Sequence, residues 1–129
     1  MDASEAIRSR LARYCHTVDA GQFDELGMCF TADAVVAVMG QRIEGRAAIE
    51  AWMTAAMPPH RRGKHVNINV AIDQAVEGRA SAVSDFLFMA QADGRWQVTQ
   101  VGQYVDTLVD DGDAWRIAHR QIHLGPSGD

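Results

Sequence analysis

The fold of this chain is organised around residues 13–21, which have the sequence RYCHTVDAG. They continue an apolar stripe that recurs every three or four residues from the N-terminus, as one face of a helix requires. Asp2 and Glu5 supply an N-cap pair, and Gly21 can take the left-handed conformation that ends a helix. We therefore predict a helix between these two signals. Its inward residues are Ile7, Leu11, Tyr14, Cys15 and Val18.

Asp19 occupies an unfavourable position at the end of this helix. A helix C-terminus carries partial negative charge, so a carboxylate there costs about 0.3 to 1 kcal/mol relative to a neutral or basic residue. A residue that local physics disfavours is a candidate for a tertiary role. The alternative is a solvated aspartate beside a turn.

Composition indicates a single soluble domain. The chain has 129 residues, 47% hydrophobic and 22% charged, and no apolar run reaches the roughly 18 residues of a membrane span. The net charge is -5 and the basic residues are scattered apart from a cluster at 61–64, so we expect no nucleic-acid binding and no membrane insertion. The acidic N-terminus lacks the basic and apolar regions of a secretory signal, which predicts a cytoplasmic protein.

Cys15 and Cys29 are predicted to be buried free thiols. They lack CxxC spacing, and each lies in a stretch with apolar periodicity. His119 and His123 would share one face of a strand at about 13 Å, too far apart to bind one metal ion. We expect neither a metal nor any other cofactor.

The next part of the chain predicts two more helices and a short hairpin. The expected elements are a short helix at 22–30 closed by a turn at 31–33, an antiparallel pair at 34–39 and 42–44 joined by a turn at 40–41, and a helix at 46–57. Gly45 opens this last helix, and Pro58 with Pro59 stops it. Residues 58–64 are basic and turn-rich, which makes them the best candidate for a mobile lid over a pocket.

From His65 onward the hydrophobic period changes to two, which is typical of half-buried strands. His65, Asn67 and Asn69 fall on one face, and the aliphatic residues between them fall on the other. Further strands are expected at 79–92, 95–109 and 114–124, joined by turns at 93–94 and 110–113. Helices followed by long antiparallel strands predict an α+β domain, in which the helices pack on one face of a curved sheet and leave a conical cavity.

The sequence offers acid and base groups for chemistry, and little else. It has no GxSxG elbow and no phosphate-binding glycine loop, so serine acyl transfer and nucleotide chemistry are not expected. Tyr14 can donate to a developing oxyanion, Asp19 can orient or charge a partner, and His65 can move a proton near neutral pH. The alternative for Tyr14 and His65 is a purely structural role at the edge of the core.

Four segments resemble SnoaL-like proteins of the nuclear transport factor 2-like superfamily: RYCHTVDAGQFDELGMCFTADAVV, GRAAIEAW, KHVNINVAI and GQYVDTLVDDGDAWRIAHRQI. The resemblance covers nearly the whole chain and is nearest to the scytalone dehydratases and bile acid 7α-dehydratases. Those enzymes share a Tyr with an Asp five residues later and a His that opens a later strand. Tyr14, Asp19 and His65 match this pattern. A further polar residue on a middle strand of those enzymes would be matched by Asp85, but a one-residue slip in register would turn it to the other face.

The resemblance implies a cone-shaped, curved antiparallel or mixed sheet wrapped around N-terminal helices, a cystatin-like α+β roll with a deep apolar pocket. It further implies a cofactor-independent, dehydratase-like lyase acting on a hydrophobic cyclic hydroxy-ketone of steroid or polyketide type. His65 would remove a proton α to a carbonyl, Asp19 would hold the imidazole, and Tyr14 would polarise the carbonyl or the leaving hydroxyl. The predicted substrate-binding residues are Phe30, Val36, Trp52, Met53, Asn67, Asp85, Phe86, Phe88 and Tyr104.

Other functions on the same scaffold remain open, because fold analogy cannot fix a reaction. One is a ketosteroid-isomerase-like or polyketide-cyclase-like isomerase, and another is a small-molecule binding protein that keeps the pocket without turnover. A third is a partner-binding dimer whose own side chains fill the cavity. We expect a homodimer or homotrimer in any case, because Val66, Ile68, Val70 and Ile72 would expose an apolar patch larger than monomers usually tolerate.

Overall fold

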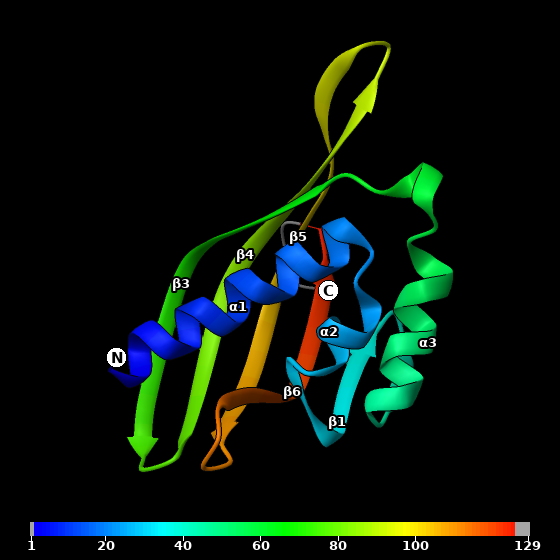
Figure 1. Cartoon of the computed structure of the whole chain (residues 1–129). Helices are drawn as coiled ribbons and strands as arrows, with labels where there is room; N and C mark the ends of the chain where they lie inside the picture. The colour runs from blue at the N-terminus through cyan, green and yellow to red at the C-terminus, as the bar shows by residue number, and fades with distance from the viewer. Residues whose placement is uncertain (1, 126–129) are drawn as a thin grey trace.

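The computed structural model describes residues 2–125, in which N-terminal helices cover one face of a six-stranded sheet (Figure 1). The sheet is curved and unclosed, with strand order β2-β1-β6-β5-β4-β3. Neighbouring strands are antiparallel except for β1 and β6, which are parallel. The predicted α+β architecture is confirmed. The elements are α1 (Ala3–Ala20), α2 (Phe23–Gly27), β1 (Phe30–Val38), β2 (Gln41–Glu44), α3 (Arg46–Ala56), the 3-10 turn η1 (Pro59–Arg61), β3 (Lys64–Val76), β4 (Arg79–Ala92), β5 (Arg95–Asp110) and β6 (Trp115–Leu124).

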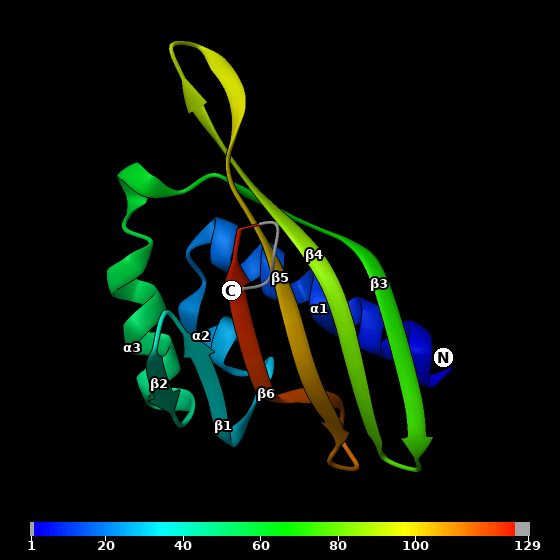
Figure 2. The same cartoon turned by 180° about the vertical axis from the view of Figure 1, so that it is seen from behind.

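Helix α1 has both of its predicted end signals. The Asp2 carboxylate accepts a hydrogen bond from the backbone N–H of Glu5 at 2.8 Å, and Gly21 closes the helix in the left-handed conformation with φ of 70°. The helix crosses the concave face of the sheet and buries its apolar stripe there (Figure 1). Figure 2 shows that, within the described residues, no helix lies over the opposite face of β3 to β6.

The core fills the space between α1, α3 and the concave face of the sheet. Cys15 and Cys29 are both buried and free, as predicted, and burial raises the pKa of the Cys15 thiol to about 11. None of the helices within residues 2–125 has the length and apolar character needed to cross a membrane.

The second helix is shorter than predicted. Helix α2 ends at Gly27, and residues 31–33, expected as a turn, belong to strand β1. The cause is pairing with β6, since the Ile117 N–H donates to the Cys29 carbonyl at 2.8 Å and Phe30 faces Ile117 in the parallel ladder. Local periodicity cannot reveal a partner strand that lies almost 90 residues away along the chain, so the prediction for this segment was wrong.

The β1–β2 hairpin turns at Met39 and Gly40, one residue earlier than predicted. Both residues have positive φ, 49° and 75°, as a type I′ hairpin turn requires. Gly45 then precedes α3 and Pro58 follows it, as the sequence indicated. Residues 58–64 are not wholly irregular, because they contain η1. Their mobility stays a prediction.

A bulge in β3 breaks the predicted alternation of faces. Asn69 has φ of 53°, and the register with β4 shifts between Ile68 and Ala71. Asn tolerates the left-handed conformation better than most residues, because its short polar side chain can bond locally. The inserted residue reverses the faces of the strand beyond it.

The bulge corrects two predictions. Asn69 does not share the face of His65, since it is exposed and donates a hydrogen bond to the Asp85 carboxylate at 2.9 Å. Val70 and Ile72, expected on the outer face, pack partly buried against the core instead. The position of His65 precedes the bulge and is unaffected by it.

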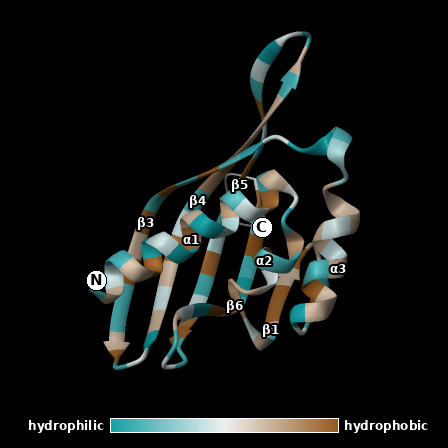
Figure 3. Ribbon diagram, in the orientation of Figure 1, coloured by the Kyte–Doolittle hydropathy of each residue, from teal (hydrophilic) through white to brown (hydrophobic). Residues whose placement is uncertain are grey.

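The long β4–β5 hairpin follows the prediction closely. Asp93 and Gly94 form its turn with positive φ of 53° and 73°, and the end of the hairpin projects beyond the rest of the sheet (Figures 1 and 2). Hydrophobic and hydrophilic residues alternate along β4 and β5 (Figure 3), as expected where one face of a sheet is covered.

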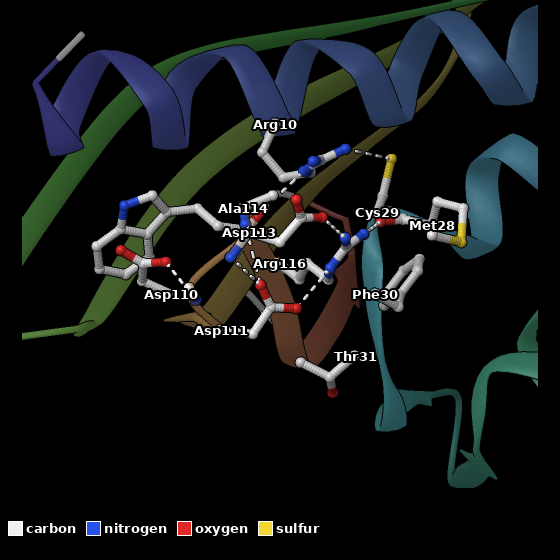
Figure 4. Close-up of polar contacts among 12 residues, drawn as sticks. Arg10, Met28, Cys29, Phe30, Thr31, Asp110, Asp111, Asp113, Ala114 and Arg116 are labelled. Carbon is white, nitrogen blue, oxygen red and sulfur yellow. Dashed lines mark hydrogen bonds and ion pairs between the residues drawn. The ribbon is translucent and has the colours of Figure 1, made fainter.

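Two arginines fasten the β5–β6 turn to the helical layer (Figure 4). Arg116 donates to the carboxylates of Asp111 and Asp113 at 2.8 and 2.9 Å, and also to the backbone carbonyl of Met28. Arg10 of α1 donates to a backbone carbonyl at the start of β6 at 2.7 Å. These contacts fix β6 beneath α1 and thereby position the side chains that β6 sends into the core.

Candidate active site

Asp19 and His65 meet, as the sequence predicted. The carboxylate at the end of α1 lies 2.7 Å from Nδ1 of His65, the second residue of β3. It also accepts the backbone N–H of His65, at 3.1 Å to one oxygen and 3.0 Å to the other. Because the carboxylate holds both the backbone and the ring, the imidazole has one defined orientation. Asp19, which is unfavourably placed at the end of its helix, therefore has a tertiary partner in His65.

The contact also defines the protonation pattern of the neutral imidazole. An ionised carboxylate has only acceptors, so the nitrogen that faces it, Nδ1, carries the hydrogen. The lone pair then lies on Nε2. Phe88 flanks the imidazole with ring centroids 4.8 Å apart, and 11% of the His65 side chain is exposed. His65 thus presents a basic nitrogen in largely apolar surroundings.

Tyr14 contributes a phenol to the same site. Its ring lies 6.5 Å from that of His65 and 5.9 Å from that of Tyr104, both in edge-on orientation. Burial raises the pKa of Tyr14 to about 12, although Arg120 acts in the opposite direction. Burial likewise holds the pKa of Tyr104 well above its ordinary value. Both phenols are therefore hydrogen-bond donors at neutral pH.

A buried ion pair lies behind these phenols, and the sequence did not predict it. Arg120 donates to both oxygens of Asp106, at 2.7 and 2.9 Å, with both side chains fully buried. The guanidinium carbon lies 4.3 Å from the ring centroid of Tyr14 and 3.7 Å from that of Tyr104. The alternation of faces along β5 could have indicated this pair, because it places Asp106 on the inward face together with Tyr104. Asp106 then pairs directly with Arg120 across the β5–β6 ladder.

Tyr14 and His65 line a cavity of about 420 Å³ between α3, β1 and the concave face of the sheet. Five of the nine predicted substrate-binding residues line it: Trp52, Met53, Phe86, Phe88 and Tyr104. The Phe86 and Tyr104 rings stack at 4.4 Å and form one wall. The walls are mainly aromatic and aliphatic, so the cavity suits an apolar ligand.

Four predicted residues do not line the cavity. Phe30 and Val36 belong to the closed core, and Asn67 donates to the hydroxyl of its neighbour Ser84 on β4. Asp85 lies between the inward residues Ser84 and Phe86 and therefore points to the opposite face. The register that would have made Asp85 an active-site residue is not the one adopted.

Nine further lining residues were not predicted individually, although one of them, Arg61, lies in the segment 58–64 that was expected to cover a pocket. They are Val38, Met39, Ala56, Met57, Arg61, Thr99, Gln100, Ile122 and Leu124. The β1–β2 turn, the end of α3, η1 and the end of β6 come together only in the tertiary fold. No motif in these segments marks them as neighbours.

A larger groove of about 910 Å³ lies between the first half of α1 and the β3–β4 and β5–β6 turns. It contains none of the three predicted catalytic residues, and exposed charged groups such as Arg13, Glu77 and Asp113 border it. Among residues 2–125, no three His, Cys, Asp or Glu side chains are grouped to hold a metal ion. Of the predicted catalytic residues, Tyr14 and His65 line the smaller cavity instead.

Comparison with known proteins gives the class. The family model for the SnoaL-like domain matches residues 1–121, so the chain belongs to the SnoaL-like family, with the nuclear transport factor 2-like, cystatin-like fold. No curated protein matches the chain significantly.

Several solved structures share the fold. Rv3472 of Mycobacterium tuberculosis, whose function is unknown, is 25% identical with a TM-score of 0.84, over 93% of this chain and 70% of that one. A Novosphingobium aromaticivorans protein, provisionally described as a scytalone dehydratase, is 24% identical with a TM-score of 0.81, over 95% and 84% of the two chains. Aln2 of a Streptomyces species is 24% identical with a TM-score of 0.86, over 94% and 89%.

Proposed function

We propose that the protein is a cofactor-independent, dehydratase-like lyase that acts on a hydrophobic cyclic hydroxy-ketone of steroid or polyketide type. The observation that carries the proposal is the 2.7 Å contact of Asp19 with Nδ1 of His65, at a cavity that Tyr14 also lines. A base, the group that orients it and a neutral donor are the three components that proton abstraction beside a carbonyl needs.

In the proposed reaction, Nε2 of His65 removes the proton α to the ketone. The electron pair of the broken C–H bond forms an enolate, whose oxygen accepts a hydrogen bond from Tyr14. The enolate then collapses to a C=C bond as the β-hydroxyl leaves, taking the proton from the imidazolium to form water. His65 returns to its neutral form. Asp19 stabilises the imidazolium that exists between the two steps.

Arg120 supports this chemistry indirectly, through Tyr14 and Tyr104. Its charge is fixed beside the rings of Tyr14 and Tyr104, where it favours negative charge developing on or near the phenols. It does not line the cavity, so we assign it a positioning and electrostatic role rather than contact with the substrate.

An isomerase is the second candidate, and one observation favours it. With Asp85 turned away, no carboxylic acid among residues 2–125 lines the cavity to protonate a leaving hydroxyl, so His65 is the proton carrier for both steps. An isomerase needs only such a single base, which removes a proton from one carbon and returns it to another. A binding protein without turnover would use the same cavity and neither step.

The test is a panel of cyclic β-hydroxy-ketones with increasing ring number, incubated with the purified protein in D2O. Dehydration converts a β-hydroxy-ketone into an absorbing enone with loss of water. Isomerisation is followed on the matching β,γ-unsaturated ketones, which it converts into the conjugated enone without loss of water. Asp19→Asn should lower the rate by about 100-fold or more with the fold intact. The matched control is Asp85→Asn, which changes a carboxylate on the other face and should leave the rate unchanged. Ligand binding without any exchange or dehydration would support the binding-protein alternative instead.

A further inference from the structure

Among residues 2–125, Arg61 is the one lining residue of the active-site cavity that carries a permanent positive charge. It lies in η1 and is exposed, whereas Tyr14 and Tyr104 border the same cavity with only 2% of each residue exposed. The cavity thus has a buried end with the phenols and a solvent end with the cation. We propose that Arg61 binds an oxyanion carried by the ligand, so that the substrate is an apolar ring system with a carboxylate or phosphate at its outer end. This inference rests on the proposed function, because it places the reacting atoms at His65.

The side chain of Arg61 is available for such a contact. Within residues 2–125 it makes no hydrogen bond and no ion pair. Its neighbour Arg62 is engaged instead, since Nε donates to the Met57 carbonyl at 3.3 Å and the guanidinium lies 5.6 Å from the ring centroid of Phe23. Within residues 2–125, all the guanidinium donors of Arg61 are therefore free for a ligand, whereas Arg62 has its Nε engaged and its guanidinium near an aromatic ring.

The backbone near Arg61 makes close contacts with the sheet and within η1. A Cβ at Gly63 would collide with the Met89 carbonyl of β4, so this close approach of the segment to the sheet requires glycine. The Arg61 N–H also donates to the Pro58 carbonyl at 2.9 Å. These contacts place the backbone of Arg61 close enough for its side chain to line the cavity.

Electrostatics at this end of the cavity favour an anion. No Asp or Glu of residues 2–125 lines the cavity, and the carboxylate that contacts the lining residue His65, that of Asp19, is already engaged by it. Residues 51–72 include Arg61, Arg62 and Lys64 but no acidic residue, although the chain as a whole has a net charge of -5. A guanidinium matches the geometry of carboxylates and phosphates, to which it can donate two parallel hydrogen bonds.

The other polar residues at the exposed end are less suited to the task. The Thr99 hydroxyl lies 3.4 Å from the Phe88 carbonyl, and the Gln100 amide donates to the Val101 carbonyl at 2.8 Å. Burying a charge deeper among the aromatic walls would be costly, so the anion belongs at the mouth. The predicted ligand is amphipathic, with its ring system inside and its charge beside Arg61.

Two fluorescent probes with the same ring system test this directly. N-phenyl-1-naphthylamine is neutral, and 8-anilino-1-naphthalenesulfonate carries an added sulfonate; both brighten in apolar cavities. Arg61→Ala should weaken binding of the sulfonate about 3- to 10-fold and leave the neutral probe unchanged. Arg61→Lys should retain part of the affinity, and added salt should weaken only the sulfonate. Arg42→Ala, an exposed arginine of β2 outside the cavity, is the matched control and should change neither probe.

Competition against the neutral probe then distinguishes the anion. We expect 2-naphthoate or 2-naphthyl phosphate to displace it more strongly than 2-naphthamide, and the stronger of the two identifies the preferred charge. Equal loss of both probes in Arg61→Ala, no loss of the sulfonate, or no advantage of either anion over the amide would overturn the inference. Failure of wild type to bind either probe would also overturn it. The first three of these outcomes leave the proposed proton chemistry unaffected, because that chemistry is tested separately by proton exchange and dehydration.

Discussion

The buried pair of Arg120 and Asp106 should be the most sensitive single interaction in the fold. We consider Asp106→Leu, which removes the carboxylate and leaves the guanidinium charged in the core. Both side chains are fully buried, and the Asp106 carboxylate holds the pKa of Arg120 above its ordinary value despite the opposing effect of burial. A guanidinium keeps its proton in proteins even without a carboxylate partner, so Arg120 cannot escape the penalty by losing it.

Leaving one member of a buried pair uncompensated costs about 3 to 5 kcal/mol. For a domain of this length, each kcal/mol lowers Tm by about 3 to 6 °C, so we expect a fall of about 9 to 30 °C. Urea unfolding followed by tryptophan fluorescence and circular dichroism gives the free energy, and calorimetry gives Tm. Part of the cost also reaches the active site, because the rings of Tyr14 and Tyr104 pack on the guanidinium.

Two controls isolate the uncompensated charge. Asp106→Leu combined with Arg120→Met removes both charges and should recover most of the lost stability. Glu44→Gln removes one member of the exposed pair with Arg42, whose side chains are 66% and 61% exposed, and should change stability by less than about 0.5 kcal/mol. A loss below about 1 kcal/mol for Asp106→Leu, or a double variant as unstable as the single one, would refute the reasoning.

Three further predictions concern ionisation and assembly. The only two tyrosines are Tyr14 and Tyr104, so the native protein should show little phenolate absorbance at pH 10. Because the folded pKa of Tyr14 is about 12 against 10.0 for a free phenol, the unfolded chain ionises first, and stability should fall as pH rises from 10 towards 12. Hydrogen bonds from the backbone at Ala114 and from Arg116 lower the pKa of Asp111 from 3.8 to about 2. The contribution of Asp111 to stability is therefore complete above pH 3.8 and is lost as the pH falls towards 2. Asp111→Asn should flatten that part of an acid unfolding curve. Light scattering should give two or three times 14.1 kDa, because Val83, Val101 and Val105 still expose an apolar strip on the helix-free face, and Val105→Glu should shift the mass towards that of the monomer; a monomeric wild type would contradict the expected oligomer.

Much of the fold could be predicted because the hydrophobic periodicity of a long amphipathic segment indicates both its secondary structure and which of its faces is buried. The α1 stripe and the even spacing of β4 and β5 reflect one covered face each, and the caps at Asp2 and Gly21 are chemically specific. The failures arose where a distant partner decided the outcome. Strand β1 begins at Phe30 only because β6 pairs with it. The bulge at Asn69 interrupts an alternation that looked regular in the sequence.

The site was predictable to the same degree. Asp19 stood out because its helix position is unfavourable, and with the family pattern this indicated the contact with His65 that the structure confirms. Their catalytic role stays a prediction. Arg120 was missed because a charge on an inward face is acceptable only with a partner, and the partner Asp106 is known only once the β5–β6 register is known. The face of Asp85 depended in the same way on the register of β4.

The central claim is that Asp19 fixes His65 with Nδ1 protonated and Nε2 free to act as the base. Long-range proton–nitrogen correlation spectra of the imidazole rings test it directly, with His65 assigned by the signal lost in His65→Gln. At mildly alkaline pH we expect the neutral ring of His65 to be the Nδ1–H tautomer in wild type. Asp19→Ala should lose this preference. His119, a residue of β6 that does not line the cavity, should keep the same spectrum in both proteins. Observation of the Nε2–H tautomer in wild type, or of the same spectrum in Asp19→Ala, would contradict the account.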